Sequence, residues 1–322
     1  MSSADSTSSI RSLHTFQIDI VHGCQLRCVG CPNSTLLEKV RRVAVEDFRR
    51  RLENVDVEYV RCMRLFNFGE PLLHDDLTGI LRVIQEQPWK PEILEVSTNA
   101  QHCNWDDFST ALQTGALTRL VASCDGDGTP ESFEALRPPA KWSKLLAFLY
   151  KARELRDLYA PDLQLVTRTI VENEEAIQRW NEVLLPLGWE PEYREWKYLP
   201  ESKENKTGRP LSAPADVCTF VAPSERFGER YHCEVNQLYV DADGVVVPCC
   251  AHPAAARLGS LEAQPASELL RSSERRAFVQ QLETDRASMP ICNQCEFGPP
   301  ENPGASFKQI SEELVEPIRL VN

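Results

Sequence analysis

The sequence predicts an α/β fold, with a partial (β/α)6 barrel followed by a small C-terminal domain made of a β-hairpin and a helix. Short apolar runs alternate with helical stretches from Thr15 to Tyr198, as in parallel strands joined by helices. A polar stretch containing Pro and Lys, Leu199 to Pro214, marks a boundary. Beyond it, Asp243-Gly244 between two apolar runs indicates a hairpin. We therefore expect a disordered N-terminus over 1–14, a barrel over 15–214 and an auxiliary domain over 215–322.

The expected elements follow one another in a regular order along the chain. Strands are predicted at Thr15–Val21, Val60–Phe66, Ile93–Ser97, Leu120–Ser123 and Leu163–Thr169, with the hairpin strands at Gln237–Val240 and Val245–Val247. Helices are predicted at Val45–Val55, His74–Gln85, Trp105–Thr114, Lys144–Tyr159, Asn173–Leu184 and Ala266–Glu283.

The composition is that of an ordinary globular protein with an acidic surface. The net charge of −13 argues against nucleic acid as a partner and is compatible with a cationic small-molecule substrate. No run approaches the roughly 20 apolar residues of a membrane helix, and the polar first nine residues do not resemble a signal peptide. We expect a cytoplasmic protein without membrane contact. Twelve cysteines in such a protein indicate metal binding or catalysis more often than disulfides.

Three of these cysteines, Cys24, Cys28 and Cys31, lie within eight residues directly after the first predicted strand. Three thiolates on one loop can hold three corners of a [4Fe–4S] cluster and leave the fourth iron open for chemistry. A zinc site completed by His22 or by a distant cysteine is the alternative.

The spacing Cys-x3-Cys-x2-Cys after a first strand resembles the radical S-adenosylmethionine (radical SAM) superfamily. The resemblance covers about Thr15 to Tyr198. It implies a TIM-like radical SAM barrel in which S-adenosylmethionine chelates the open iron and is cleaved to a 5′-deoxyadenosyl radical that abstracts a substrate hydrogen. It also implies an external electron donor such as flavodoxin or ferredoxin.

The same resemblance implies a set of cofactor-binding residues at the ends of the later strands. Phe68-Gly69-Glu70-Pro71 is similar to the family's Gly-Gly-Glu motif, with Phe68 in place of the first glycine, and implies that Glu70 contacts the methionine amino group. Asp125-Gly126 could equally be a plain turn, and Arg168 a surface residue. The implied cofactor-binding residues are Glu70, Ser97, Asn99, Ser123, Asp125 and Arg168.

A second set of cysteines lies in the C-terminal region. Cys233, Cys249, Cys292 and Cys295 resemble the ligands of a shortened SPASM module, called a twitch domain, which implies one auxiliary [4Fe–4S] cluster. A zinc site with the same ligands is the alternative. Cys62, Cys103 and Cys124 are expected to be buried fillers, and Cys218 is a less favoured ligand.

The adjacent pair Cys249 and Cys250 leaves one thiol unused by this cluster. Neighbouring side chains in extended backbone point in opposite directions, so only one of the two is expected to be a metal ligand. The motif spacing favours Cys249 as the ligand, and a one-residue slip would exchange the roles. The other thiol is either a small buried apolar group or a hydrogen-atom donor.

The spare thiol leads us to expect an epimerase, in which a cysteine quenches the substrate radical. The size of the chain and its C-terminal module resemble radical SAM enzymes of aminoglycoside biosynthesis, which would place it in antibiotic biosynthesis. The alternatives are a dehydrogenase of an aminocyclitol, an oxidoreductase that needs no spare cysteine, and an enzyme that modifies a ribosomal peptide. A non-enzymatic iron–sulfur or zinc-binding module is a further alternative.

Overall fold

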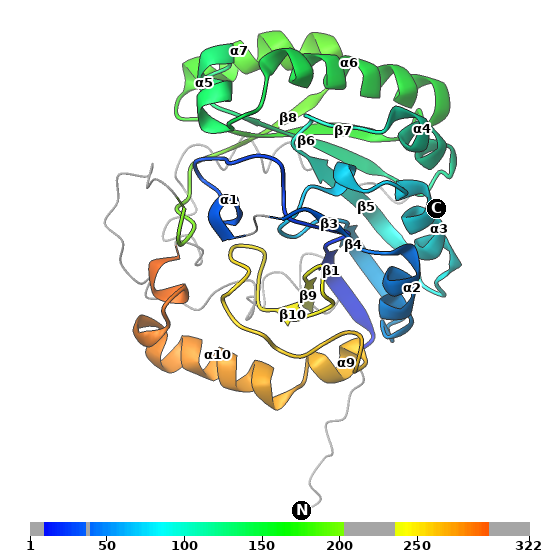
Figure 1. Ribbon diagram of the computed structural model, residues 1–322, viewed down its shortest axis with the longest axis vertical. Coiled ribbons are helices and arrows are strands. Elements are labelled where there is room, and N and C mark those ends of the chain that lie inside the picture. The colour runs from blue at the N-terminus through cyan, green and yellow to red at the C-terminus, as the bar shows by residue number, and fades with distance from the viewer. Residues whose placement is uncertain (1–9, 37–38, 203–235, 296–322) are drawn as a thin grey trace, which may run out of the picture.

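The fold is seen in a computed structural model that describes residues 10–36, 39–202 and 236–295 (Figure 1). Its centre is an eight-stranded sheet with the order β10-β9-β1-β4-β5-β6-β7-β8. Six consecutive strands are parallel and form the partial barrel: β1 (Ser12–Ile18), β4 (Tyr59–Arg64), β5 (Pro91–Thr98), β6 (Arg119–Asp125), β7 (Gln164–Ile170) and β8 (Glu190–Arg194). The predicted α/β partial barrel is confirmed.

Helices cover the outer side of this curved sheet, as Figure 1 shows. Along the chain, each neighbouring pair of barrel strands is joined through helix, as parallel pairing requires. Asp76, Asn104 and Asn173 cap α3, α4 and α7 by accepting a backbone N–H of the first turn. The covering helices are α2 (Val45–Glu53), α3 (Leu77–Glu86), α4 (Trp105–Gln113), α5 (Pro130–Leu136), α6 (Trp142–Tyr159) and α7 (Glu174–Leu184).

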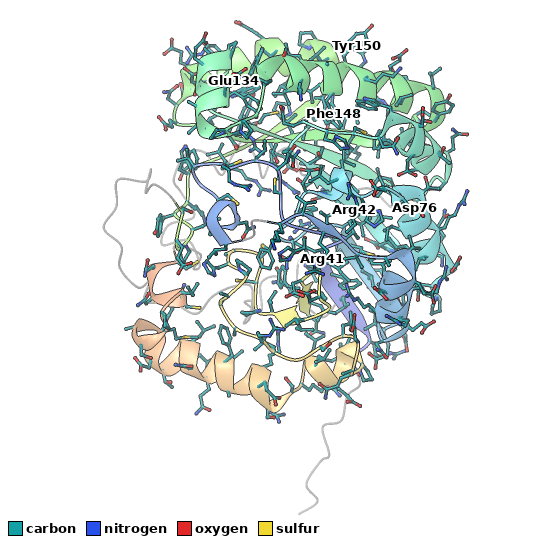
Figure 2. All side chains as sticks on the ribbon, viewed as in Figure 1. Arg41, Arg42, Asp76, Glu134, Phe148 and Tyr150 are labelled. Atoms are coloured by element: carbon teal, nitrogen blue, oxygen red, sulfur yellow. The ribbon has the colours of Figure 1, made fainter. Side chains whose placement is uncertain are left out.

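The two faces of the sheet differ sharply in polarity. The face toward the helices is apolar, with Phe16, Leu94 and Leu120 in one large core. Figure 2 shows the same division on α6, which directs Phe148 toward the sheet and Tyr150 away from it. The opposite face is polar, because Gln17, Arg64, Glu95 and Arg119 stand side by side in register across β1, β4, β5 and β6. The interior of the barrel is therefore charged.

The C-terminal region is built onto the barrel sheet. Strand β9 (Gln237–Val240) pairs in parallel with β1, and β10 (Val246–Val247) pairs antiparallel with β9. The turn between them places Gly244 at φ +76°, a conformation that favours glycine. The predicted hairpin is present, and it continues the barrel sheet.

Helices α9 (Ala266–Leu269) and α10 (Ser273–Asp285) follow the hairpin. The sequence predicted one helix here. A break separates the two helices, and the Ser272 side chain caps α10 by accepting the Arg275 N–H. The buried Arg51 of α2 binds Glu262 and the carbonyl of Ala242, which ties this region to the barrel.

Several elements escaped the sequence analysis. Strand β8 reads Glu-Pro-Glu-Tyr-Arg and lacks an apolar run, and α5 is only seven residues long. The short antiparallel strands β2 (Val21–His22) and β3 (Arg41–Arg42) flank the cysteine loop, which contains α1 (Asn33–Leu36). Strand β1 begins at Ser12, three residues earlier than predicted. The predicted boundary between 214 and 215 lies outside the described residues. Within the described part of the chain, no helix has the length and apolar character needed to span a membrane.

Candidate functional site

Several predicted site residues of the N-terminal region lie at or just after the carboxyl ends of the parallel strands. The cysteine loop follows β1, the loop 67–70 follows β4, Asn99 follows β5 and Asp125 ends β6. Because these strands are parallel, their carboxyl ends lie at one rim of the barrel, where such folds carry their chemistry.

Asp19, directly after β1, holds the loop that follows β4. Its carboxylate accepts the backbone N–H groups of Asn67, Phe68 and Gly69 at 2.7 to 3.0 Å. Asp19 is 2% exposed, and burial raises its pKa to about 7 in spite of these bonds. The sequence analysis missed this residue, although a lone carboxylate at the end of an apolar strand was a usable signal.

Gly69 allows this loop to approach the chain after β1. A Cβ atom at this position would lie 1.8 Å from the carbonyl oxygen of Val21. The Glu70 N–H in turn donates to the carbonyl oxygen of Gly23 at 3.0 Å, next to Cys24. The Gly69-Glu70 segment is thereby fixed against the cysteine loop.

The side chain of Glu70 is buried and fully engaged. Its carboxylate accepts the Thr98 hydroxyl at 2.6 Å, the Asn99 N–H at 2.7 Å and the Leu72 N–H at 3.0 Å. Burial raises the pKa of Glu70 to about 7, against the opposing effect of these donors. An acidic group at the rim is thus joined to the end of β5.

Asn99 connects this carboxylate to the cysteines. Its Nδ2 donates to the Sγ of Cys24 at 3.4 Å and to Oε1 of Gln25 at 3.1 Å. The structure therefore joins Glu70, Asn99 and Cys24, three residues predicted from separate segments, into one hydrogen-bonded chain. Ala100, the next residue, has φ +58°, a strained value for a residue with a Cβ.

The three N-terminal thiols are of the ligand type that holds iron–sulfur clusters. Burial raises the pKa of the Cys24 thiol to about 12, with further contributions from Glu70, Cys28 and Cys31, so these groups lie within electrostatic reach of one another. A metal that binds thiolates would offset this cost of ionisation. Among the described residues, no three His, Cys, Asp or Glu side chains are already gathered around one point as a metal site.

Arg168 lies in the charged interior of the barrel. Its Nη1 and Nη2 bind the two carboxylate oxygens of Glu95 at 2.6 and 2.9 Å, and its Nε binds Glu192 at 3.3 Å. Arg64 and Arg119 also approach Glu95, which is fully buried. These arginines hold the pKa of Glu95 down at about 2, although burial acts in the opposite direction.

The residues at the end of β6 take different environments. Asp125 is buried and forms an ion pair with Arg137, a residue that the sequence analysis did not single out. Ser123 stands in register with Arg168 on the polar face of the sheet, and Ser97 lies on the same face of β5. Ser97 and Ser123 therefore face the barrel interior.

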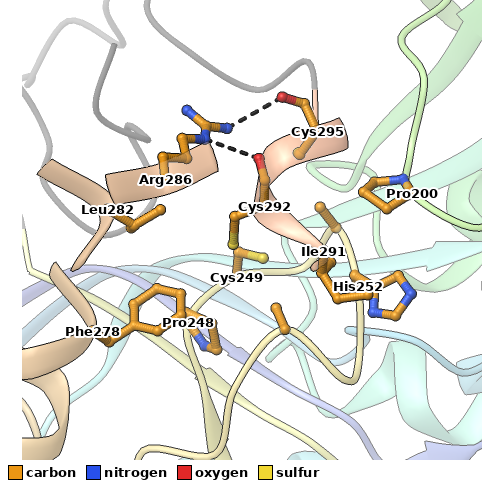
Figure 3. A pocket seen from close by; sticks show the side chains of 12 residues that line it. Pro200, Pro248, Cys249, His252, Phe278, Leu282, Arg286, Ile291, Cys292 and Cys295 are labelled. Carbon is orange, nitrogen blue, oxygen red and sulfur yellow. Dashed lines mark hydrogen bonds between the residues drawn. The ribbon is translucent and has the colours of Figure 1, made fainter. Parts of the chain in front are cut away.

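Three of the described C-terminal cysteines meet in one pocket. Cys249, Cys292 and Cys295 line it together with Pro248, His252 and Arg286 (Figure 3). The sulfur atoms of Cys249 and Cys292 point toward one another in this view. Cys233 and Cys218 lie outside the described residues.

Arg286 anchors the Cys292–Cys295 turn. Its Nε donates to the carbonyl of Cys292 at 2.9 Å and its Nη2 to the carbonyl of Cys295 at 3.2 Å, as the dashed lines in Figure 3 show. The side chain is buried. Nothing in the sequence distinguished Arg286 from other arginines, because its role depends on the turn that follows α10.

Cys249 and Cys250 pack in different places. Cys249 belongs to a cluster with Ala251 and Cys295. Cys250 packs against a second cluster formed by Phe68, Tyr239, Val245 and Val247. Because Phe68 directly precedes Gly69-Glu70, the second thiol lies on the side of the barrel rim.

Comparison with known proteins gives one family match and several structural relatives. Residues 232–296 match SPASM, an iron–sulfur cluster-binding domain. The chain is similar to BtrN in complex with AdoMet and 2-DOIA, with a TM-score of 0.51 and 16% identity over 89% of this chain and 94% of that one. It is also similar to native anSMEcpe with bound AdoMet, with a TM-score of 0.59 and 15% identity over 94% of this chain and 95% of that one.

A further complex, native anSMEcpe with bound AdoMet and Cp18Cys peptide, gives a TM-score of 0.58 and 14% identity over 94% of this chain and 95% of that one. No curated protein matches in sequence. At these identities the structural relatives establish the fold. The family match confirms the prediction of a SPASM-type iron–sulfur region at the C-terminal cysteines.

Proposed function

We propose that this chain is a radical SAM enzyme with two [4Fe–4S] clusters. The observation that carries the proposal is the hydrogen-bonded chain from Glu70 through Asn99 to Cys24. It joins a buried carboxylate to a cysteine of the triad at the rim of a parallel barrel. The solved structures of BtrN and anSMEcpe, which share the fold, contain AdoMet.

In this proposal Cys24, Cys28 and Cys31 would hold the first cluster, and this group would supply the electron for reductive cleavage of S-adenosylmethionine to the 5′-deoxyadenosyl radical. Glu70 binds the methionine amino group, and Asp19 keeps the Glu70 loop in place through three backbone bonds. Asn99, Ser97, Ser123, Asp125 and Arg168 complete the polar rim and interior around the cofactor. Cys233, Cys249, Cys292 and Cys295 hold the auxiliary cluster.

The reaction we propose is epimerisation of a carbon in an aminoglycoside. The deoxyadenosyl radical removes a hydrogen atom, and Cys250 returns one to the opposite face. The thiyl radical left on Cys250 then takes up one electron and one proton. The packing of Cys250 against Phe68 and of Cys249 against Cys295 supports the assignment of Cys250 as donor and Cys249 as ligand.

The acidic chain, with a net charge of −13, would attract a polyamine substrate over long range. A flavodoxin or ferredoxin would supply the electrons. The second candidate is dehydrogenation of an aminocyclitol, because BtrN, whose structure contains 2-DOIA, shares the fold. In that reaction the substrate radical loses a proton and gives its electron to the auxiliary cluster, with no hydrogen-atom donor.

The test is anaerobic reconstitution followed by turnover in deuterated water with a panel of aminoglycosides and aminocyclitols. Release of 5′-deoxyadenosine is expected, and its absence would leave the non-enzymatic iron–sulfur or zinc module as the better hypothesis. One deuterium at an inverted carbon identifies an epimerase, whereas a ketone identifies a dehydrogenase.

The pair of variants Cys249→Ala and Cys250→Ala assigns the two thiols. Loss of Cys250 should leave the iron content intact and let 5′-deoxyadenosine accumulate without epimerised product. Loss of Cys249 should remove auxiliary iron. Reversed outcomes would exchange the two roles, and full turnover in both variants would eliminate the donor.

A further inference from the structure

Arg137 lies directly opposite Cys28. The N–H of Arg27 donates to the carbonyl of Pro138 at 2.6 Å, and the N–H of Val29 donates to the carbonyl of Leu136 at 2.9 Å. The two chain segments therefore run antiparallel, and Cys28 and Arg137 face one another between these two hydrogen bonds. The segment after α5 therefore acts as a backbone support for the middle of the cysteine loop.

The guanidinium of Arg137 is buried and only partly satisfied. Arg137 is 8% exposed, and its Nη1 binds the Asp125 carboxylate. Its Nε has no hydrogen-bond partner in the described part of the chain. Burying a cation with an unused donor is costly, and buried donors without partners occur at sites where another group is bound.

The electrostatic surroundings of Arg137 point to the cysteine loop. The pairing of the two segments places Arg137 beside Cys28, and its guanidinium forms a buried ion pair with Asp125. Arg137 also favours the ionised form of Glu70, although burial of Glu70 dominates. One fixed positive charge thus acts on both the triad and the cofactor-binding carboxylate.

We propose that Arg137 is a positioning residue for the first iron–sulfur cluster, and that its charge makes this cluster easier to reduce. The inference rests on the proposed function, because it assumes a cluster on Cys24, Cys28 and Cys31. A reduced cluster carries one more negative charge than an oxidised one, so a buried cation beside Cys28 stabilises the reduced form. Asp125 holds the guanidinium in place and offsets part of this effect.

The test is a redox titration of reconstituted protein followed by electron paramagnetic resonance, using the signal that changes when S-adenosylmethionine is added. Arg137→Met keeps much of the side-chain volume but removes the charge, and its midpoint potential should be more negative than that of the wild type. Arg137→Lys restores the charge and should return the midpoint toward the wild-type value. Asp125→Asn removes the counter-charge and should shift the midpoint in the positive direction.

The opposite signs separate a charge effect from general damage, because structural disruption has no reason to shift the two variants in opposite directions. Arg51→Met is the matched control, since Arg51 is also buried and ion-paired but binds Glu262 and Ala242. Its midpoint should not change. If Arg137→Met binds no iron, the midpoint potentials of Asp125→Asn and Arg137→Lys still test whether the charge of Arg137 acts on the cluster.

Unchanged midpoints in the Asp125 and Arg137 variants, or shifts of the same sign, would overturn the inference. Its failure is distinct from that of the proposed function. A wild-type enzyme that releases 5′-deoxyadenosine, combined with unshifted midpoints, rejects only the role of Arg137. A wild-type chain that binds no iron at the triad rejects both.

Discussion

The two cysteine regions of this chain are assembled in different ways. The N-terminal triad lies on one loop, and side chains and backbone from β1, β4, β5 and the segment after α5 surround it. The C-terminal cysteines come from two distant segments, with Cys249 after the hairpin and Cys292 and Cys295 in a turn after α10. Arg286 fixes that turn, and Cys249 packs against Cys295 at its end.

This difference indicates that the two cysteine regions contribute differently to chemistry and to stability. The triad is local in sequence, so its cysteines remain close to one another even if the barrel opens. The C-terminal set depends on the tertiary fold and in return can stabilise it, because metal binding and folding are coupled where the ligands are distant. Loss of the first site should therefore affect chemistry most, and loss of the second should affect stability as well.

The largest expected effect comes from removing either set of cysteines. Changing Cys24, Cys28 and Cys31 together to Ala should halve the iron, from about eight to about four per chain, and abolish cleavage of S-adenosylmethionine. Changing Cys292 and Cys295 should also halve the iron and lower the melting temperature much more. Iron analysis and thermal unfolding measure both. Equal loss of stability in the two variants would contradict the proposed difference between the two regions. Stoichiometric zinc at the second site would show that this site binds zinc and no iron–sulfur cluster.

The ion network inside the barrel gives the next largest effect. Arg168→Ala removes both bonds to the fully buried Glu95 and should lower the free energy of unfolding by about 3 kcal/mol. The loss should not be larger, because Arg64 and Arg119 still face this carboxylate. Glu192→Gln, at the outer edge of the network, should cost less than about 1 kcal/mol. Denaturant unfolding measures both. A small loss for Arg168→Ala, together with weakened S-adenosylmethionine binding, would favour a direct contact with the cofactor.

The Glu70→Gln variant tests the chemistry of the first region without removing a cysteine. A charge-assisted contact to the methionine amino group is worth about 1.5–3 kcal/mol, so the affinity for S-adenosylmethionine should fall by about 10- to 150-fold. The iron content should stay at the wild-type level. Equilibrium binding to the reconstituted protein measures the change, and unaltered affinity would remove Glu70 from the site.

Arg286→Met tests the turn of the second region. The variant loses the bonds to the carbonyls of Cys292 and Cys295, and bonds from a charged donor are each worth about 1.5–3 kcal/mol. It should lose about half of its iron on dilution while the triad keeps its share. Arg276→Met, at an exposed position of α10, is the control and should retain all of it. Equal retention by both variants would mean that Arg286 does not hold the turn.

The last expected effect is a pH dependence at Asp19. Its pKa is raised to about 7 from the ordinary value of 3.8, so the folded protein binds this proton more tightly than the unfolded chain. The contribution of Asp19 to stability should therefore increase as the pH falls from about 7 toward about 4, by at most about 1.4 kcal/mol per pH unit. Asp19→Asn should have a flatter profile in denaturant unfolding between pH 5.5 and 7.5. Parallel profiles would show that the burial of Asp19 has no such consequence.

Much of this protein can be inferred from the sequence because its signals are local. Alternating apolar runs and helical periods predicted five of the six barrel strands, and the spacing of Cys24, Cys28 and Cys31 predicted their common loop. Asp243-Gly244 predicted the hairpin, because a tight turn needs a residue that tolerates positive φ. Strand β8 was missed because its polar residues owe their strand conformation to pairing with β7.

The partners of the charged residues were decided only by the tertiary structure. Arg168 is 73 residues from Glu95 in the sequence, yet the register of β5, β6 and β7 brings them into one network. In the same way, the tertiary fold brings Asp19 to the loop 67–69 and places Arg137 opposite Cys28. It also brings Arg286 to the carbonyl groups of Cys292 and Cys295. A sequence specifies which groups are present and their local conformation. The electrostatic partner of a buried charge depends on which distant segment the fold places beside it, because burial makes such interactions strong only at close range.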